Sequence, residues 1–340
     1  MSAEKRLGAH TVRLGAPVAV LAAGNAAGRK EGEGPLRQSI DVVYGDDLMG
    51  QDSWEKAESH IQRQALDMAL KKAAADITAI DMVFAGDLLN QCVGSTFGLR
   101  ESGVPLYGLY GACSTMAEGL SLAAICIDGG FAARTAAVTS SHYCSAERQY
   151  RLPLDYGAQR APTAQWTVTG AGAVLLGTRG PGPYITHVAT GKIVDPGVTD
   201  AANMGAAMAP AAYDTLSAFF RESGLGPEAH DLIVTGDLGG VGAQIVRDLF
   251  LDDGVDLGSR YNDCGLMIFD CKKQDVHSGG SGCGCSAVVL CGHIFAQMRA
   301  GIWNSVLFCG TGALHSPTTA AQGDSIPGVA HAVRFTSQPA

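Results

Sequence analysis

The stretch Gly108-Leu-Tyr-Gly-Ala-Cys-Ser-Thr115 decides the fold of this chain. It follows a β-favouring run at residues 104–110 and precedes an apolar, helix-favouring run at residues 116–125. A turn of small residues between a strand and a helix would present the sulfur of Cys113 at the start of the helix. Backbone N–H groups and the positive end of the helix dipole favour a thiolate at that position. The stretch therefore predicts a nucleophilic cysteine of the kind used in acyl transfer, rather than a buried structural cysteine.

Apolar runs of strand length alternate with amphipathic runs of helix length on both sides of this stretch, which is typical of an α/β fold. In the first half, strands are predicted at residues 12–23, 80–85, 104–110, 133–140 and 166–176. Helices are predicted at residues 52–75, 88–99 and 114–127, and loops at residues 24–34 and 141–162.

The chain also contains an internal repeat. Asp81-Met-Val-Phe-Ala-Gly-Asp-Leu88 recurs as Asp231-Leu-Ile-Val-Thr-Gly-Asp-Leu238, an offset of 150 residues. The cysteine turn has a counterpart in Gly282-Cys-Gly-Cys-Ser286, which also precedes an apolar helix-favouring run. The matching order of elements predicts two similar, mostly parallel α/β halves, residues 1–178 and 179–340.

Composition excludes several classes of protein. A net charge of −9 and an isoelectric point near 5.4 argue against a nucleic-acid partner. No window reaches about 18 uninterrupted apolar residues, so we expect at most peripheral membrane association. Ten cysteines without a secretory signal indicate reduced thiols inside a cell. They lack the paired Cys-x-x-Cys spacing of zinc sites, and we expect neither a metal nor a cofactor.

Several sequence blocks resemble one known family. They are Gly86-Asp-Leu-Leu-Asn-Gln91, Tyr110-Gly-Ala-Cys-Ser-Thr115, Ser140-Ser-His142, Ala146-Glu-Arg-Gln149, Thr167-Val-Thr-Gly-Ala-Gly172, Met208-Ala-Pro-Ala-Ala212, Asn262-Asp-Cys-Gly-Leu-Met267 and Gly279-Gly-Ser-Gly-Cys-Gly-Cys-Ser286. Together they resemble the stage V sporulation protein AD family of spore-forming bacteria, a branch of the thiolase superfamily. The resemblance covers residues 12–335 and implies a duplicated, five-layered α-β-α-β-α fold. It also implies a homodimer formed through the strand at residues 133–140.

The resemblance carries a functional expectation. It implies a protein that binds dipicolinic acid and takes part in its uptake into the developing spore. Such a protein would lie inside the spore or forespore, held at the inner membrane by other transport proteins of the same system.

The sequence departs from the condensing enzymes of the superfamily at the second half of the site. Asp237 follows the predicted strand at residues 232–235, where those enzymes are expected to have a histidine. A carboxylate there would raise the pKa of Cys113 and repel an enolate oxyanion. We therefore predict a binding protein and not an enzyme. The alternative is a thiolase-like or ketoacyl-synthase-like acyltransferase that uses Cys113, with His142 or His315 supplying the imidazole.

Dipicolinate is a flat dicarboxylate, and arginine side chains bind carboxylates with two parallel hydrogen bonds. The segment at residues 146–160 contains Arg148, Arg151 and Arg160, which either meet the ligand or pair with Glu147 and Asp155. Because Asp87 and Asp237 would repel a bare dianion, the ligand alternatively arrives as its calcium chelate. The predicted ligand-binding residues are Cys113, Asp87, Asn90, His142, Arg148, Arg151, Asp237 and Ser286.

Overall fold

The computed structural model describes residues 5–150 and 160–339. In the first half, the main strands are β1 (Thr11–Ala27), β3 (Met82–Gly86), β4 (Leu106–Leu109), β5 (Arg134–Ser141) and β7 (Gly170–Gly177). In the second half they are β8 (Tyr184–Thr190), β9 (Leu232–Thr235), β10 (Tyr261–Asp263), β12 (Ser305–Ala313) and β13 (Gly328–Thr336). Three strands of two residues complete the set: β2 (Val42–Val43), β6 (Trp166–Thr167) and β11 (Gly280–Ser281).

Helices cover and separate the strands. The longer ones are α2 (Trp54–Lys72), α4 (Thr115–Asp128), α6 (Met204–Ser223) and α7 (Gly239–Asp252). The shorter ones are α1 (Arg29–Gly32), α3 (Val93–Leu99), α5 (Tyr143–Tyr150), α8 (Cys264–Ile268), α9 (Cys283–Val289), α10 (Phe295–Arg299) and α11 (Pro317–Ala321). None of the helices in the described residues is both long and apolar enough to cross a membrane.

The strand order is the same in both halves. The first half reads β4-β3-β5-β7-β1 and the second reads β10-β9-β12-β13-β8. In each half three strands are parallel, and the fourth and fifth are each antiparallel to their neighbours. β1 and β8 pair with each other, so the two sets form one continuous sheet. The boundary predicted after residue 178 falls between β7 and β8.

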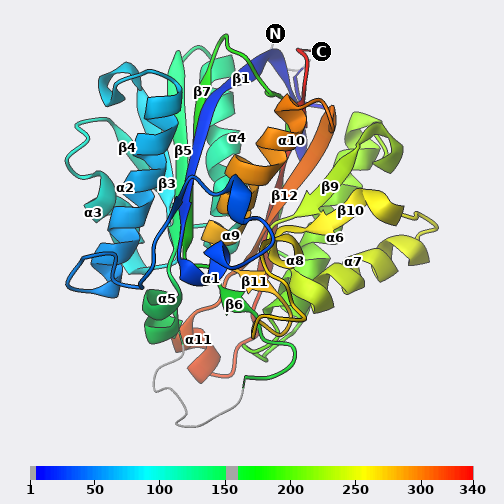
Figure 1. Cartoon of the computed structure of the whole chain (residues 1–340). Helices are drawn as coiled ribbons and strands as arrows, with labels where there is room; N and C mark the ends of the chain where they lie inside the picture. The colour runs from blue at the N-terminus through cyan, green and yellow to red at the C-terminus, as the bar shows by residue number, and fades with distance from the viewer. Residues whose placement is uncertain (1–4, 151–159, 340) are drawn as a thin grey trace.

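The elements stack in five layers (Figure 1). α2 covers the outer face of the first half, α6 and α7 cover the outer face of the second, and α4, α9 and α10 fill the space between. Met116 and Leu120 of α4 belong to one buried cluster with side chains of both halves, among them Phe84 and Phe308. The predicted thiolase-like α/β fold is confirmed.

Several predicted boundaries were wrong. β1 continues to Ala27, through residues predicted as a loop, because Gly24 and Asn25 pair with β7. The predicted loop at residues 141–162 contains α5. Helix α7 was not predicted, since its glycine-rich start is a poor helix signal. Its first N–H groups are satisfied by Asp263, whose carboxylate accepts from Leu238 and Gly239 at 2.8 and 2.9 Å.

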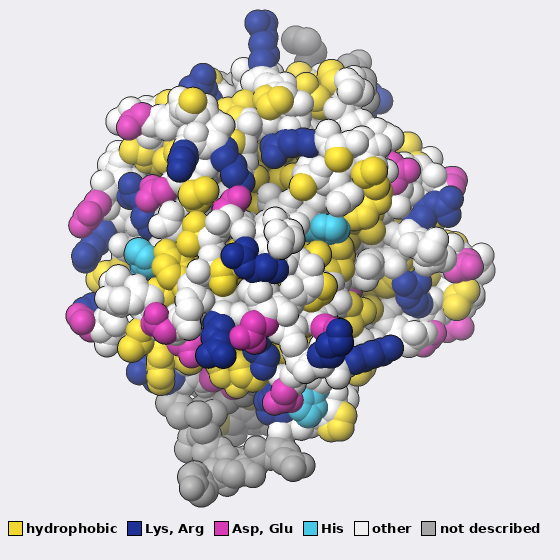
Figure 2. Space-filling view, viewed as in Figure 1, with side chains coloured by type: hydrophobic (Ala, Val, Ile, Leu, Met, Phe, Trp, Pro, Cys, Tyr) yellow, Lys and Arg dark blue, Asp and Glu magenta, His cyan; other side chains and the backbone are white. Residues whose placement is uncertain are grey.

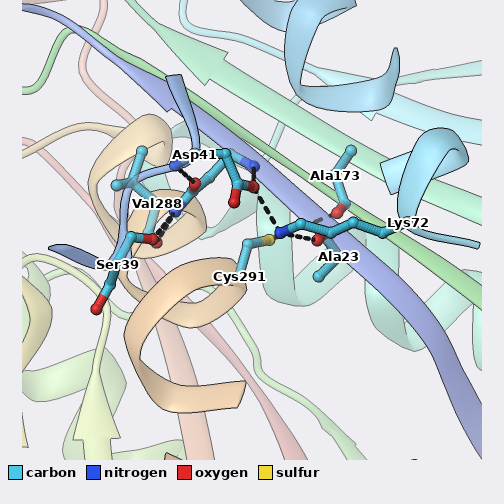
Figure 3. A network of polar contacts seen from close by, with 8 residues as sticks. Ala23, Ser39, Asp41, Lys72, Ala173, Val288 and Cys291 are labelled. Carbon is cyan, nitrogen blue, oxygen red and sulfur yellow. Dashed lines mark hydrogen bonds and ion pairs between the residues drawn. The ribbon is translucent and has the colours of Figure 1, made fainter. Parts of the chain in front are cut away.

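A buried asparagine, Asn25, ties the middle layer to the sheet. Its partners Ser39, Asp41 and Val288 are labelled in Figure 3. Asn25 Nδ2 donates to the carbonyl oxygens of Ser39 and Val288, at 3.1 and 3.0 Å. The carboxylate of Asp41 accepts from the backbone N–H of Asn25 and from Lys72 Nζ, at 3.0 and 2.7 Å. These bonds join β1, the end of α2 and α9, and α9 begins directly after the turn that faces Cys113.

The strand predicted to form a dimer interface is in the interior of the sheet. β5 pairs with β3 on one side and with β7 on the other. Because β5 has no unpaired edge, residues 133–140 cannot pair with a second copy. The predicted homodimer therefore needs a different strand. The edge of this half of the sheet is β4, where Leu106 and Tyr107 are exposed.

Candidate functional site

Cys113 lies in a tight turn between β4 and α4. The turn is a single 3₁₀ turn over Ala112–Ser114, and α4 begins at the next residue. Ala112 has a φ of +49°, a left-handed conformation that residues with a Cβ seldom adopt. Ser114 Oγ donates to the carbonyl oxygen of Gly111 at 2.7 Å, which helps to hold the chain in this shape. The predicted strand–turn–helix arrangement is therefore present around Cys113.

Strand β12 of the second half presses against this turn. A Cβ atom placed on Gly312 would lie 2.3 Å from the carbonyl oxygen of Gly111, and one on Gly310 would lie 2.7 Å from Ala117 Cβ. These approaches are closer than non-bonded contacts allow, so only glycine fits at both positions. The second half of the chain thereby lies directly against the cysteine turn.

The carboxylate of Asp237 is the second half's main contribution beside Cys113. It is fully buried in the turn after β9. Its Oδ1 accepts a hydrogen bond from Thr311 Oγ1 at 2.8 Å. Its Oδ2 accepts from the backbone N–H of Gly282 at 2.8 Å and from Ser281 Oγ at 3.2 Å. Burial outweighs these bonds and raises the pKa of Asp237 to about 6.

Asp237 also affects whether the sulfur of Cys113 is a thiol or a thiolate. The Asp237 carboxylate and the thiol of Cys283 both lie close enough to Cys113 to act on its ionisation. Burial, followed by repulsion from Asp237 and Cys283, raises the pKa of Cys113 well above its ordinary value. The sulfur is thus held as a thiol, and the positive end of α4 does not offset this. The structure agrees with the direction expected from the sequence.

A pocket of about 590 Å³, its open mouth included, lies over Cys113. Its walls combine aromatic, thioether and small side chains. The hydroxyl groups of Tyr110 and Tyr150 are 2.7 Å apart, and the rings of Tyr150 and His315 have centroids 5.8 Å apart. No lysine or arginine is among the described residues that line it. These are Leu88, Tyr110, Ala112, Cys113, Ala146, Glu147, Tyr150, Thr167, Met204, Met208, Ser281, Ala313 and His315.

Two further carboxyl groups are buried behind the pocket. Asp87, in the turn after β3, accepts from the backbone N–H and the hydroxyl of Ser95, both at 2.7 Å. Glu58 of α2 accepts from Ser145 Oγ at 2.6 Å. Burial raises the pKa of both groups, and for Glu58 the nearby Asp87 adds to the effect. Asp87 and Asp237 follow equivalent strands of the two halves, as the repeat predicted.

The other predicted ligand-binding residues lie away from the pocket lining. His142 Nε2 is 2.8 Å from the carbonyl oxygen of Asp47. Ser286 is buried within α9. Asn90 and Arg148 line a separate shallow groove.

The predicted arginines differ in their surroundings. Arg148 forms an ion pair with Glu55, a partner that the sequence analysis did not consider. Arg160 Nη2 is 2.7 Å from a carboxylate oxygen of Asp275, and its guanidinium lies over the Trp166 ring. Arg151 lies outside the described residues.

Sequence reasoning missed most of the pocket wall. Tyr110 and Ser281 each belong to a motif that the sequence analysis quoted, but neither was given a role. Met204 and Met208 belong to α6, which packs against β12 and β13 from the outer face. Their spacing in the sequence is the same as that of residues in a hydrophobic core, so it does not indicate a pocket wall. Glu58 was also missed, since it lies on an otherwise ordinary amphipathic helix.

Comparison with known proteins identifies the family. The family model of stage V sporulation protein AD (SpoVAD) matches residues 8–336. The chain belongs to the SpoVAD family. Stage V sporulation protein AD of Bacillus subtilis (strain 168) is 46% identical over 319 residues, which cover 94% of each chain. The SpoVAD resemblance predicted from the sequence blocks is confirmed, and the chain is a member of a sporulation protein family.

Solved structures with the same fold are condensing enzymes. The OleA structure of Xanthomonas campestris with cerulenin bound has a TM-score of 0.60 at 14% identity, covering 95% of this chain and 99% of that one. The 3-oxoacyl-(acyl carrier protein) synthase III of Xanthomonas oryzae has a TM-score of 0.59 at 14% identity, covering 95% and 100%. At this level of identity the likeness extends to the fold alone.

Proposed function

We propose that this member of the SpoVAD family is a non-catalytic binding protein for dipicolinic acid, which acts in the uptake of that acid into the developing spore. The observation that carries the non-catalytic part is the buried carboxylate of Asp237 beside Cys113, which adds to burial in raising the pKa of the thiol. A thiolate, and not a thiol, is the nucleophile in acyl transfer. A carboxylate beside the sulfur works against ionisation and against any oxyanion formed in the reaction.

The pocket walls suit a small planar molecule. Tyr110, Tyr150 and His315 offer ring surfaces for an aromatic ligand, and Thr167 offers a hydroxyl donor. Glu147 and the buried Asp237 disfavour a bare dianion at this position. Dipicolinic acid would therefore bind here with its charge reduced, either by protonation or by a calcium ion that it already chelates. The described residues contain no cluster of three side chains able to hold a metal ion, so such a calcium would enter with the ligand.

Calorimetric titration of dipicolinate into the purified full-length protein tests this proposal. Tyr110→Ala removes a ring from the wall and is expected to weaken binding by up to about tenfold. Arg148→Ala is the matched control, since Arg148 lies in the other groove and should leave the affinity unchanged. Loss of binding in Arg148→Ala with full retention in Tyr110→Ala would place the ligand elsewhere.

The same titration is repeated in the presence of calcium. The comparison distinguishes protonation of the ligand from chelation of calcium as the way in which its charge is reduced. Tighter binding with calcium supports the chelate, and tighter binding on lowering the pH without calcium supports the protonated acid. Equal affinity under all these conditions would contradict the electrostatic argument.

The alternative function is acyl transfer by Cys113. It is favoured by one observation, namely that His315 lines the same pocket as Cys113. Incubation with an acyl-coenzyme A followed by intact-mass measurement distinguishes the two functions, with Cys113→Ala as the control. Under our proposal the wild-type mass stays unchanged. A stable acyl adduct that Cys113→Ala lacks would establish the alternative.

We further propose that the protein acts inside the spore or forespore, at the inner membrane, beside other transport proteins of the same system. Family membership supports this location, and the helices give no membrane span within the described residues. Attachment would then depend on those partners or on the surface of the molecule.

A further inference from the structure

A second groove lies at the end of the molecule opposite Cys113. It forms where β1, β8 and β13 run side by side, and residues at the end of α6 contribute to its wall. Its volume is about 1,400 Å³, the open mouth included. α4 runs from the cysteine turn to Asp128, whose carboxylate contacts Lys5 on the wall of this groove. The 14 residues of α4 separate the two sites by roughly 20 Å.

Three basic side chains form a row across this groove. Arg13 of β1 pairs in register with His187 of β8, and His187 pairs with Arg334 of β13. Residues opposite one another on neighbouring strands point to the same face, and all three line the groove. With strands about 4.8 Å apart, the two arginines flank the imidazole across roughly 10 Å.

This row is not neutralised by the protein itself. None of the described residues that line the groove is acidic. Two carboxylates on segments beside the groove are engaged elsewhere: Glu222 accepts from the backbone N–H groups of residues 9–11, and Asp128 pairs with Lys5. Within the described residues, neither Arg13 nor Arg334 has an ion-pair partner. The two arginines place like charges on one face of the sheet, two strands apart, and an anion between them would reduce their repulsion.

Arg334 has a buried hydrogen-bond donor that none of the described residues satisfies. Its Nη1 donates to Thr186 Oγ1 at 3.1 Å, which fixes the guanidinium. Its Nε is buried and makes no hydrogen bond to any described residue. A buried donor without an acceptor is costly, and a guanidinium satisfies it best with an oxyanion bound through two N–H groups.

We propose that this groove is a second binding site, separate from the Cys113 pocket, and that it binds a phosphate group through Arg13 and Arg334. Two guanidinium groups lie on opposite sides of His187, and their N–H groups are the donors that the groove offers, since the Ser223 hydroxyl donates to the carbonyl oxygen of Phe219. These donors converge from more directions than one planar carboxylate can accept. A tetrahedral phosphate presents oxygens in all of them. The phosphate belongs either to a small phosphate compound or to the headgroup of a phospholipid.

Two measurements on the full-length protein test this site and distinguish the two sources. Inorganic phosphate is titrated by calorimetry in a buffer free of phosphate and sulfate. Flotation with vesicles compares phosphatidylglycerol with phosphatidylcholine. We expect saturable binding in at least one arm, one phosphate per chain in the first or retention only by phosphatidylglycerol in the second. Binding of inorganic phosphate identifies a small phosphate compound as the ligand. Binding to phosphatidylglycerol vesicles without binding of inorganic phosphate identifies the phospholipid headgroup.

The variants connect either result to the groove. Arg13→Gln and Arg334→Gln should each weaken binding about tenfold or more, because each removes a charge-assisted hydrogen-bond donor. Arg13 is exposed, so its variant should fold normally even if Arg334→Gln does not. Arg260→Gln, which changes an exposed arginine outside the groove, should bind as the wild type does. The absence of binding in both arms, or wild-type binding by Arg13→Gln, would overturn the proposal.

Discussion

Cys113 has the backbone setting of a nucleophile, but burial and the nearby Asp237 carboxylate raise the pKa of its thiol. Asp237→Asn keeps the size of the side chain and removes its charge, so the pKa of Cys113 should fall. A fall of one unit raises the thiolate fraction about tenfold below the pKa. Alkylation of Cys113 by iodoacetamide at pH 8, followed by peptide mapping, should accelerate by about that factor. The exposed Cys271 serves as an internal reference, and an unchanged ratio of the two rates would contradict this account.

The same carboxylate makes stability depend on pH. Burial raises the pKa of Asp237 to about 6 from its ordinary 3.8, so the folded state binds more protons than the unfolded state between these values. Stability should therefore fall as the pH rises from about 4 to 6, by roughly 3 kcal/mol from this group. Thermal unfolding at several pH values measures this slope, which Asp237→Asn should flatten. An identical slope in the variant would show that other groups cause it.

At the scale of elements, the cysteine turn depends on how closely β12 approaches it. Gly312→Ala would place a methyl group 2.3 Å from the carbonyl oxygen of Gly111, so the strand or the turn must move. We expect a loss of about 1–3 kcal/mol in the free energy of unfolding, measured by urea denaturation. Gly108→Ala is the matched control, because a Cβ atom there meets nothing within 4 Å. Equal stability of the two variants would mean that β12 does not press on the turn.

The edge strand β4 is the element to which we now assign the expected homodimer. It carries exposed Leu106 and Tyr107, with Phe97 and Tyr110 also exposed on the adjoining segments. Unpaired edges with apolar side chains favour pairing with a second copy. Tyr107→Lys should convert a dimer to a monomer in size-exclusion chromatography with light scattering, while Tyr44→Lys, outside this edge, should not. A wild-type protein that is monomeric at micromolar concentration would contradict the assignment.

At the scale of the whole molecule, the sequence predicted the fold because its strongest signals are local and repeated. The eight residues from Asp81 and their copy from Asp231 each contain a buried strand and its turn, so the duplication was visible without contacts. The effect of Asp237 on Cys113 was also predicted, because the resemblance to the thiolase superfamily places the turn after β9 beside the cysteine turn. On the face shown in Figure 2, Lys and Arg side chains are interspersed with Asp and Glu side chains.

The rest of the site depends on tertiary contacts that sequence patterns do not carry. Arg148 was predicted to meet the ligand, but its ion pair with Glu55 of α2 depends on how α5 packs. His142 was placed near the sulfur by its position after a strand, but its ring binds the carbonyl oxygen of Asp47. The row of Arg13, His187 and Arg334 is formed by register between three strands that are far apart in the chain.

The pairing of β1 with β8 has a consequence for biosynthesis. β1 leaves the ribosome before β8, which begins at Tyr184, so one side of β1 waits while the residues between them are made. During that interval the backbone N–H and C=O groups on this side of β1 are unpaired, and the apolar side of α4 is exposed. Nascent chains can therefore associate with one another. A truncated polypeptide ending near residue 178 should accordingly precipitate, as expected if the two halves fold together in spite of their common design.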